Sequence, residues 1–224
     1  MDEKTAIRTI NWLRRLDEKN EMEMEDLLAL VKKPSPLLAK PLRNLSRDAD
    51  WQGLNDRLII PFVAWADVVC AYCENGLSAI IAMARKRDHL SHLALAVLET
   101  LNNQESAEVL ADLLEDTATT TYQAEYLKKL TSTFNLVVSF GKTIRLDEKD
   151  CKRSNQALST ILTAATSSGN TTLQACCLYA FRGTGDKKVI DLLKKQPDLP
   201  EPWGKTKKDV IRHIQKRIKS QNNA

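Results

Sequence analysis

Residues Leu90 to Glu115 read LSHLALAVLETLNNQESAEVLADLLE. Apolar side chains recur at helical spacing on both sides of the pair Asn102-Asn103, which interrupts the pattern. This arrangement predicts two helices joined by a short turn, because asparagine favours turns and is a weak helix former. We therefore expect one antiparallel helix hairpin in this part of the chain.

A second stretch of the same kind lies near the other end of the chain, at Thr172 to Lys195. Each stretch contains a first and a second predicted helix. Placing Asn102-Asn103 on Gly185-Asp186 aligns an apolar pair in the second helix of one stretch with an apolar pair in the second helix of the other, without a gap and at an offset of 83 residues. A further predicted hairpin, Thr121 to Asn170, lies between the two stretches. The chain therefore has the internal periodicity of a repeat protein.

The segment YAFRGTGDKKVIDLLKK, inside the second stretch, resembles a HEAT repeat. It has small and apolar residues on a first helix, a Gly-x-Gly-Asp turn and an apolar second helix, and the offset of 83 residues is close to twice the ~40–47 residue period of HEAT and armadillo units. The resemblance implies a right-handed α-solenoid of stacked helix hairpins with a concave, macromolecule-binding surface. Leu90 to Glu115 resembles the repeat less closely.

The composition favours an all-α protein. Seven glycines and seven prolines are few for 224 residues, and alternating β-branched runs, which are typical of strands, are scarce. Prolines and a polar stretch before residue 53 indicate a division of the chain. We expect N-terminal helices over 1–50, packed as a cap, HEAT-like repeats over 51–204, and a basic C-terminal helix and tail over 205–224.

The positive charge of the chain is concentrated in its last predicted helix. Seven Lys and Arg residues lie between Lys205 and Lys219 against Asp209 alone, a balance of +6, whereas the whole chain carries +4. The remainder is therefore acidic, at −2, unlike a protein that grips a nucleic-acid backbone along its length. We interpret this helix as a solenoid cap; a nucleic-acid contact and a docking site for an acidic partner are the alternatives.

Five cysteines, an odd number, lie mostly within apolar helical runs. This distribution predicts reduced, buried thiols in a cytoplasmic protein rather than a disulfide framework. Cys70 and Cys73 form a C-x-x-C motif near the C-terminal end of an apolar helix, where burial raises the thiol pKa. No signal peptide is visible, and the longest apolar run, Leu58 to Cys73, is too short to cross a membrane. We expect no membrane association.

No arrangement of residues predicts a metal ion or another cofactor. His89 and His92 are three residues apart, but no Cys or carboxylate at suitable spacing completes a metal site. We interpret them as surface or capping residues and expect His213, in the basic helix, to be solvated. The segment Arg182 to Lys187 lacks the preceding strand and the spacing of a phosphate-binding loop, so an inter-helix turn accounts for it.

Asp67 is the most unusual single residue, because it lies inside an apolar helix. A buried carboxylate requires a partner, so we expect a structural aspartate bonded to a neighbouring helix. HEAT-like DNA glycosylases use an aspartate with aromatic residues on a basic concave surface, which makes Asp67 the catalytic candidate of an enzymatic alternative. The acidic balance outside the last helix argues against that alternative.

The resulting hypothesis is a non-enzymatic, protein-binding α-solenoid. The concave ridge of such folds is usually formed by the second helix of each hairpin. The predicted protein-binding residues are the polar residues of the two second helices: Gln104, Glu105, Glu108, Asp112, Lys187, Lys188, Asp191, Lys194 and Lys195. A bacterial toxin-neutralising (immunity) protein that occludes its partner is the specific version, and a nucleic-acid binder and a scaffold subunit are the alternatives.

Overall fold

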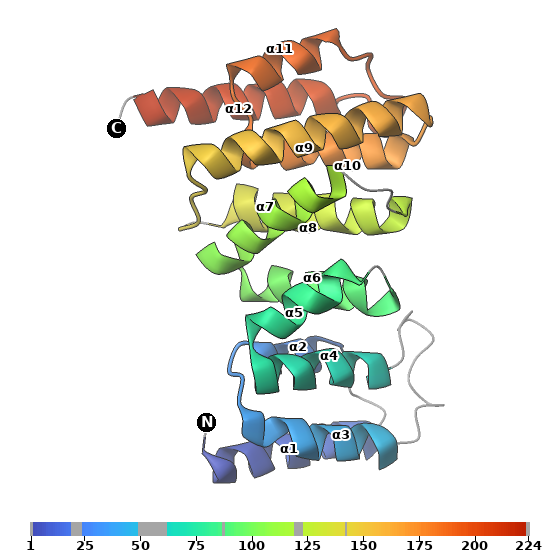
Figure 1. The fold of residues 1–224 in the computed structure, drawn as a ribbon, viewed down its shortest axis with the longest axis vertical. Helices are drawn as coiled ribbons and strands as arrows, with labels where there is room; N and C mark the ends of the chain where they lie inside the picture. Colours follow the sequence, from blue (N-terminus) through green and yellow to red (C-terminus); the bar gives the residue numbers. More distant parts are fainter. Residues whose placement is uncertain are drawn as a thin grey trace. The chain divides into compact units, whose positions relative to one another are not determined.

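The computed structural model describes residues 2–18, 24–48, 62–86, 88–118, 123–141 and 143–222. Within these ranges all regular secondary structure is helical, which confirms the predicted all-α class (Figure 1). The described helices are α1 (Glu3–Glu18), α2 (Met24–Val31), α3 (Pro36–Asp48), α4 (Phe62–Asn75), α5 (Leu77–Arg85), α6 (His89–Leu101), α7 (Gln104–Ala118), α8 (Ala124–Phe140), α9 (Glu148–Ser167), α10 (Thr171–Thr184), α11 (Lys187–Lys195) and α12 (Thr206–Asn222). None of them is both long enough and apolar enough to cross a membrane.

Several helices begin at a side chain that caps them. The carboxylate of Asp2 accepts a hydrogen bond from the Thr5 amide at 2.7 Å and so caps α1. Three further helices, α9, α10 and α11, are capped in the same way by Asp147, Asn170 and Asp186. The sequence also predicts a helix from Glu21, a central helix over Arg57 to Gly76 and a helix from Thr121, and these three starts lie outside the described residues.

The chain divides into two compact units, Met1–Leu101 (unit 1) and Asn102–Ala224 (unit 2). The divisions expected at residues 50 and 204 stay predictions. In unit 1, α4 packs against α2, α3, α5 and α6, while α1 packs against α3. The apolar residues of α4 explain this central position, since Trp65, Val68 and Val69 are almost completely buried. The described part of the predicted central helix is thereby confirmed.

Unit 2 consists of two layers of helices. In one layer α7 packs against α9; in the other α8 packs against α10, and α10 against α12. Contacts of α7 with α8, α9 with α10 and α11 with α12 join the layers, and Figure 1 shows α9 in front of α10. Fully buried side chains come from both layers, among them Leu110 of α7, Phe134 of α8 and Phe181 of α10. Helices therefore pack against the helix two positions along the chain as well as against their neighbour.

The stretch Leu90 to Glu115 forms two helices, but not the single packed hairpin that we expected. The division between the units falls at Leu101 and Asn102, inside the predicted turn. The first helix, α6, packs against α2, α4 and α5 of unit 1, whereas α7 packs against α8 and α9 of unit 2. The spacing of apolar residues locates a helix and its buried face; it does not identify the helix against which that face packs.

Replacing Gly169 with alanine is expected to destabilise unit 2 by about 1 kcal/mol. Gly169 lies in the turn between α9 and α10 with a φ of +68°, and a Cβ added there meets no atom within 4 Å. The cost is therefore conformational and not steric. Urea unfolding followed by circular dichroism measures it. Because asparagine tolerates positive φ better, Gly169→Asn should lose less stability; equal losses would contradict this explanation.

Candidate functional site

Unit 2 contains a cavity of about 670 Å³ where several segments of the chain meet. Its walls come from the end of α8, the segment 143–147, the start of α9, the C-terminal part of α10 and the C-terminal half of α12. This volume lies in the range of pockets that hold small ligands or the side chains of a partner. The cavity is therefore the first place in unit 2 to look for a binding site.

Two glycines allow the walls of the cavity to approach each other. Gly141 ends α8, and a Cβ on it would overlap the side chain of Ile144, which folds back against the end of the helix. Gly183 lies on α10 opposite α8, and a Cβ on it would come within 2.6 Å of Val138 Cγ1. Any other residue at either position would push these segments apart.

Gln104 holds the segment that carries Arg145 in place. Its Nε2 donates a hydrogen bond to the Arg145 carbonyl at 2.9 Å, and its Oε1 accepts one from the Arg145 amide at 3.0 Å. The same Nε2 also donates to Glu108 Oε1 at 2.8 Å. One side chain thus satisfies both backbone groups of a residue in an irregular segment.

Replacing Gln104 with leucine is expected to raise the exchange rate of the Arg145 amide by on the order of 10-fold, because both backbone hydrogen bonds are lost. Hydrogen–deuterium exchange followed by NMR measures the rate. Gln156→Leu, at an exposed position on α9, is the control and should leave the rate unchanged. An unchanged rate in Gln104→Leu would mean that other contacts hold the segment.

Three arginines from three segments line the cavity: Arg145, Arg182 of α10 and Arg217 of α12. No Asp or Glu is among the described lining residues. Within the described part of the chain, none of the three guanidinium groups forms an ion pair. Their contacts are with neutral groups: the Gly185 carbonyl for Arg217, the Ile144 carbonyl at 2.6 Å for Arg145, and the Tyr179 ring at 4.3 Å for Arg182.

The other titratable groups at the cavity add no charge near neutral pH. Partial burial, together with the positive charges of Arg182, Arg217 and Lys216, lowers the pKa of His213 below 6.5. Burial raises the pKa of the Cys151 thiol, which therefore stays protonated and is a weak nucleophile. The positive charge of the cavity thus comes from its arginines, and the chemistry that they offer is the binding of an anion.

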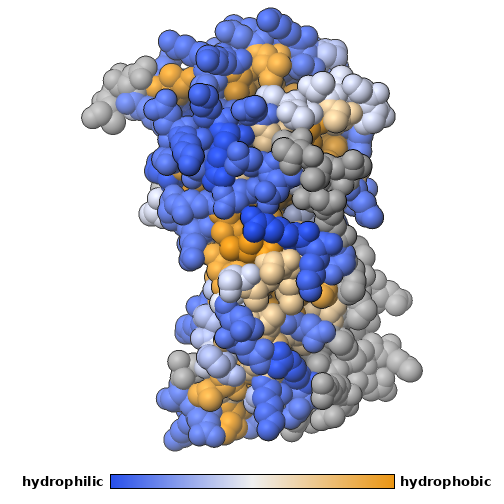
Figure 2. Space-filling view, in the orientation of Figure 1, coloured by the Kyte–Doolittle hydropathy of each residue, from blue (hydrophilic) through white to orange (hydrophobic). Residues whose placement is uncertain are grey.

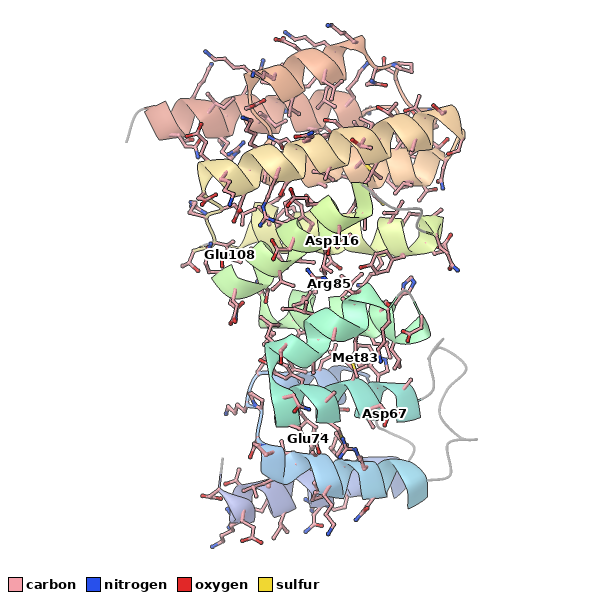
Figure 3. The ribbon with its side chains drawn as sticks, viewed as in Figure 1. Asp67, Glu74, Met83, Arg85, Glu108 and Asp116 are labelled. Atoms are coloured by element: carbon pink, nitrogen blue, oxygen red, sulfur yellow. The ribbon has the colours of Figure 1, made fainter. Side chains whose placement is uncertain are left out.

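The predicted binding residues of α7 lie on its N-terminal half. Gln104, Glu105 and Glu108 are exposed, and Figure 3 labels Glu108 on this helix. Asp112 is partly buried and forms an ion pair with Arg153 of α9. Three of the four residues therefore make contacts within unit 2: Gln104 supports a wall of the cavity, Glu108 accepts a hydrogen bond from Gln104, and Asp112 joins α7 to α9.

The predicted binding residues of α11 are all exposed. Lys187 and Lys188 lie in the first turn, and an ion pair within the described part of α11 joins Asp191 to Lys194 at 4.0 Å. Lys195 ends the helix. Because α11 packs against α12 and α7 packs against α8 and α9, the structure places the two predicted sets on helices with different packing partners. Contact of either set with a partner stays a prediction.

The expectation that Asp67 is buried is wrong. Figure 3 labels Asp67 on α4. Its side chain is exposed, although its neighbours Ala66 and Val68 are fully buried. Glu74, two helical turns further on, is also exposed and shares this face; its carboxylate accepts two hydrogen bonds from Arg43, each of 2.6 Å. A solvated carboxylate requires no structural partner, so the reason for singling out Asp67 disappears.

The C-x-x-C cysteines are buried, as predicted. Burial raises the pKa of both thiols, that of Cys70 to about 12, and the Cys70 thiol donates to the Ala39 carbonyl at 3.3 Å. In the part of the chain that the structure describes, no group of three or more His, Cys, Asp or Glu residues is arranged to hold a metal ion. His92 lies on α6, and the side chain of His89 lies outside the described atoms.

The sequence prediction did not identify the arginines of the cavity. It places Arg182 in an inter-helix turn and Arg217 in a solenoid cap. A signal existed in α12, where Val210, Ile214 and Arg217 share one helical face and the first two are fully buried. A cation among the apolar positions of a helix indicates a half-buried side chain, which is an unusual environment for a charged group.

Comparison with protein-family models, curated proteins and solved structures finds no match for this chain. The geometry and the charge of the cavity are therefore the basis on which its function is argued.

Proposed function

We propose that this protein is a non-enzymatic, protein-binding α-helical repeat protein, and that unit 2 binds an acidic partner at the arginine-lined cavity. The observation that carries the proposal is that three arginines line one cavity and have no carboxylate partner among the described residues. Such groups attract negative charge and, because guanidinium groups hydrogen-bond in a fixed geometry, also orient it.

A HEAT-like, right-handed α-solenoid is the architecture that we propose. The packing in unit 2 supports it, since α7 and α9 on one side, and α8, α10 and α12 on the other, contact the helix two positions along. Stacked hairpins produce this pattern, because equivalent helices of successive repeats lie side by side. The proposal keeps the predicted α7 and α11 residues as parts of the binding surface.

The charge of unit 2 favours an acidic partner. It contains 19 Lys and Arg against 14 Asp and Glu, a net charge of +5, whereas unit 1 contains 14 against 15. Cations continue from the cavity over the exposed side of α12, at Arg212, Lys216 and Lys219. Figure 2 shows mainly hydrophilic residues over unit 2 on the side that it displays, around α9. Such a surface steers an acidic partner towards the cavity.

The chemistry at the cavity supports binding rather than catalysis. Nucleophilic catalysis requires an activated nucleophile beside a base. The Cys151 thiol has a raised pKa, and the described lining residues include no carboxylate. The version that we favour is a cytoplasmic bacterial immunity protein that neutralises a toxin by covering its active site.

A nucleic-acid-binding protein is the second candidate, because α11 and α12 expose many cations. The DNA-glycosylase form of this alternative loses its main argument, since Asp67 is exposed rather than buried. A nucleic-acid backbone also requires a track of cations, whereas the three arginines converge on one cavity.

Fluorescence anisotropy with two labelled probes tests the proposal. One probe is a hexaglutamate peptide and the other is a hexathymidylate without terminal phosphate. The protein should have the higher affinity for the peptide at physiological salt. Arg182→Met should weaken peptide binding, whereas Lys40→Met, at an exposed position on α3 of unit 1, should not. Tighter binding of the oligonucleotide, with a steep salt dependence, would favour the second candidate. A pull-down from the native organism and the identity of the neighbouring gene test the immunity version.

A further inference from the structure

The cavity of unit 2 offers hydrogen-bond donors that its own chain leaves unused. The Nε atoms of Arg182 and Arg217 are buried and have no hydrogen-bond partner among the described residues. The same holds for the hydroxyl of Ser139, which also lines the cavity. Buried donors are nearly always satisfied in folded proteins, so these three indicate a site that lacks its acceptor. A ligand that carries several acceptor atoms would reach them after the side chains turn towards the cavity.

The aspartates closest to the cavity are engaged elsewhere. Asp147 accepts a hydrogen bond from the Asp150 amide at 2.6 Å and caps α9. Asp186 accepts one from the Val189 amide at 2.9 Å and caps α11. The carboxylate of Asp150 binds Arg153, also at 2.9 Å. Among the described residues none of these carboxylates forms an ion pair with a cavity arginine, and Asp186 offsets the charge of Arg217 only from beyond ion-pair distance.

We propose that the cavity binds a phosphomonoester, which the protein partner presents as a phosphorylated side chain. That the partner is a protein rests on the function proposed above; the chemistry of the anion rests on the cavity alone. A phosphomonoester carries a charge of about −1.5 to −2 near neutral pH and three strong acceptor oxygens. A carboxylate carries one negative charge and balances one arginine of three. The phosphate group therefore matches both the charge and the number of donors.

The size and the walls of the cavity agree with a phosphate that is attached to a chain. A volume of about 670 Å³ holds more than the phosphate group itself. Val138, Phe140 and Ile144 provide apolar walls beside the arginines, and they can contact the carbon atoms of the phosphorylated residue and its neighbours. A phosphodiester of a nucleic-acid backbone fits this site less well, because it carries a single negative charge and has a substituent on both sides of the phosphate.

Binding of labelled heptapeptide libraries to the full chain tests this assignment. The libraries are random except at the central residue, which is phosphoserine, glutamate or serine. The phosphoserine library should bind at least about 10-fold more tightly than the glutamate library. Arg182→Met and Arg217→Met should each weaken its binding by on the order of 10- to 100-fold. Arg217→Lys keeps the charge but loses the forked geometry and should give an intermediate loss.

Lys4→Met and Lys40→Met, at exposed positions on α1 and α3 of unit 1, are the matched controls and should stay within about twofold of the unchanged protein. Circular dichroism and urea midpoints establish that the arginine variants fold; if Arg217→Met does not, Arg182→Met and Arg217→Lys carry the test.

Equal affinity for the phosphoserine and glutamate libraries would overturn the phosphomonoester assignment while leaving an acidic partner in place. Absence of binding to either library would remove both proposals. Adenosine monophosphate binding more tightly than the phosphoserine library would overturn the assignment to a protein-borne phosphate.

Discussion

Replacing Phe134 with alanine is expected to lower the free energy of unfolding of unit 2 by about 3–5 kcal/mol. Phe134 is 0 % exposed and lies on α8, which packs against both α7 and α10. Removing its ring takes away buried apolar contacts and leaves a cavity that two layers of close-packed helices cannot fully close. The loss is a large part of the ~5–15 kcal/mol that holds a typical domain folded. Urea unfolding followed by circular dichroism measures it.

Phe140 provides the matched control, because it is the same residue type on the same helix. It is 57 % exposed and lies in the last turn of α8. Phe140→Ala should therefore cost less than about 1 kcal/mol, since little of its ring leaves water on folding. Losses of similar size in the two variants would show that burial in this structure does not determine the stability of unit 2.

Helix positions could be predicted from the sequence because they depend on local information. The spacing of Leu27, Leu28 and Leu30 indicates α2, and the capping aspartates and asparagines mark where other helices begin. The basic helix expected within residues 205–224 corresponds to α12. In each case, residues within one or two helical turns decide the outcome.

Packing partners could not be predicted in the same way. An apolar stripe on α6 or α7 is compatible with many neighbours, so the apparent hairpin Leu90 to Glu115 divides between two units. The error over Asp67 has a related origin. A helix that is apolar nearly all round can still keep one narrow exposed face, and hydropathy averaged over its length conceals that face.

The arginine-lined cavity depends on contacts between residues far apart in the sequence. Arg145, Arg182 and Arg217 come together only because α8, α10 and α12 pack in one layer and Gln104 holds the intervening segment. Each arginine by itself resembles a solvated surface residue. What distinguishes them is the absence of a carboxylate partner among the described residues, and that property is visible only in three dimensions.

Replacing Asn155 with alanine is expected to destabilise unit 2 by about 2–3 kcal/mol, because two buried polar groups lose their partner. Asn155 lies on α9 and Thr184 at the end of α10, and both side chains are buried. The Asn155 Nδ2 donates to the Thr184 carbonyl at 3.0 Å, and the Thr184 hydroxyl donates to Asn155 Oδ1 at 2.7 Å. This reciprocal pair joins α9 to the end of α10, two residues after Arg182. Urea unfolding measures the loss, and Gln156→Ala, at the exposed position next to Asn155, should stay within about 0.5 kcal/mol.

A double-mutant cycle with Thr184→Val separates the hydrogen bonds from the rest of the effect. If the two side chains act as a pair, the double variant should lose less stability than the two single variants together, by about 1 kcal/mol, because a second unpaired group is no longer created. Additive losses would mean that each residue stabilises the fold through other contacts. Thr184 of this pair is also next in sequence to a residue that lines the cavity. If the two side chains act as a pair, Asn155→Ala should therefore bind the hexaglutamate probe more weakly. Gln156→Ala should bind the probe as tightly as the unchanged protein does.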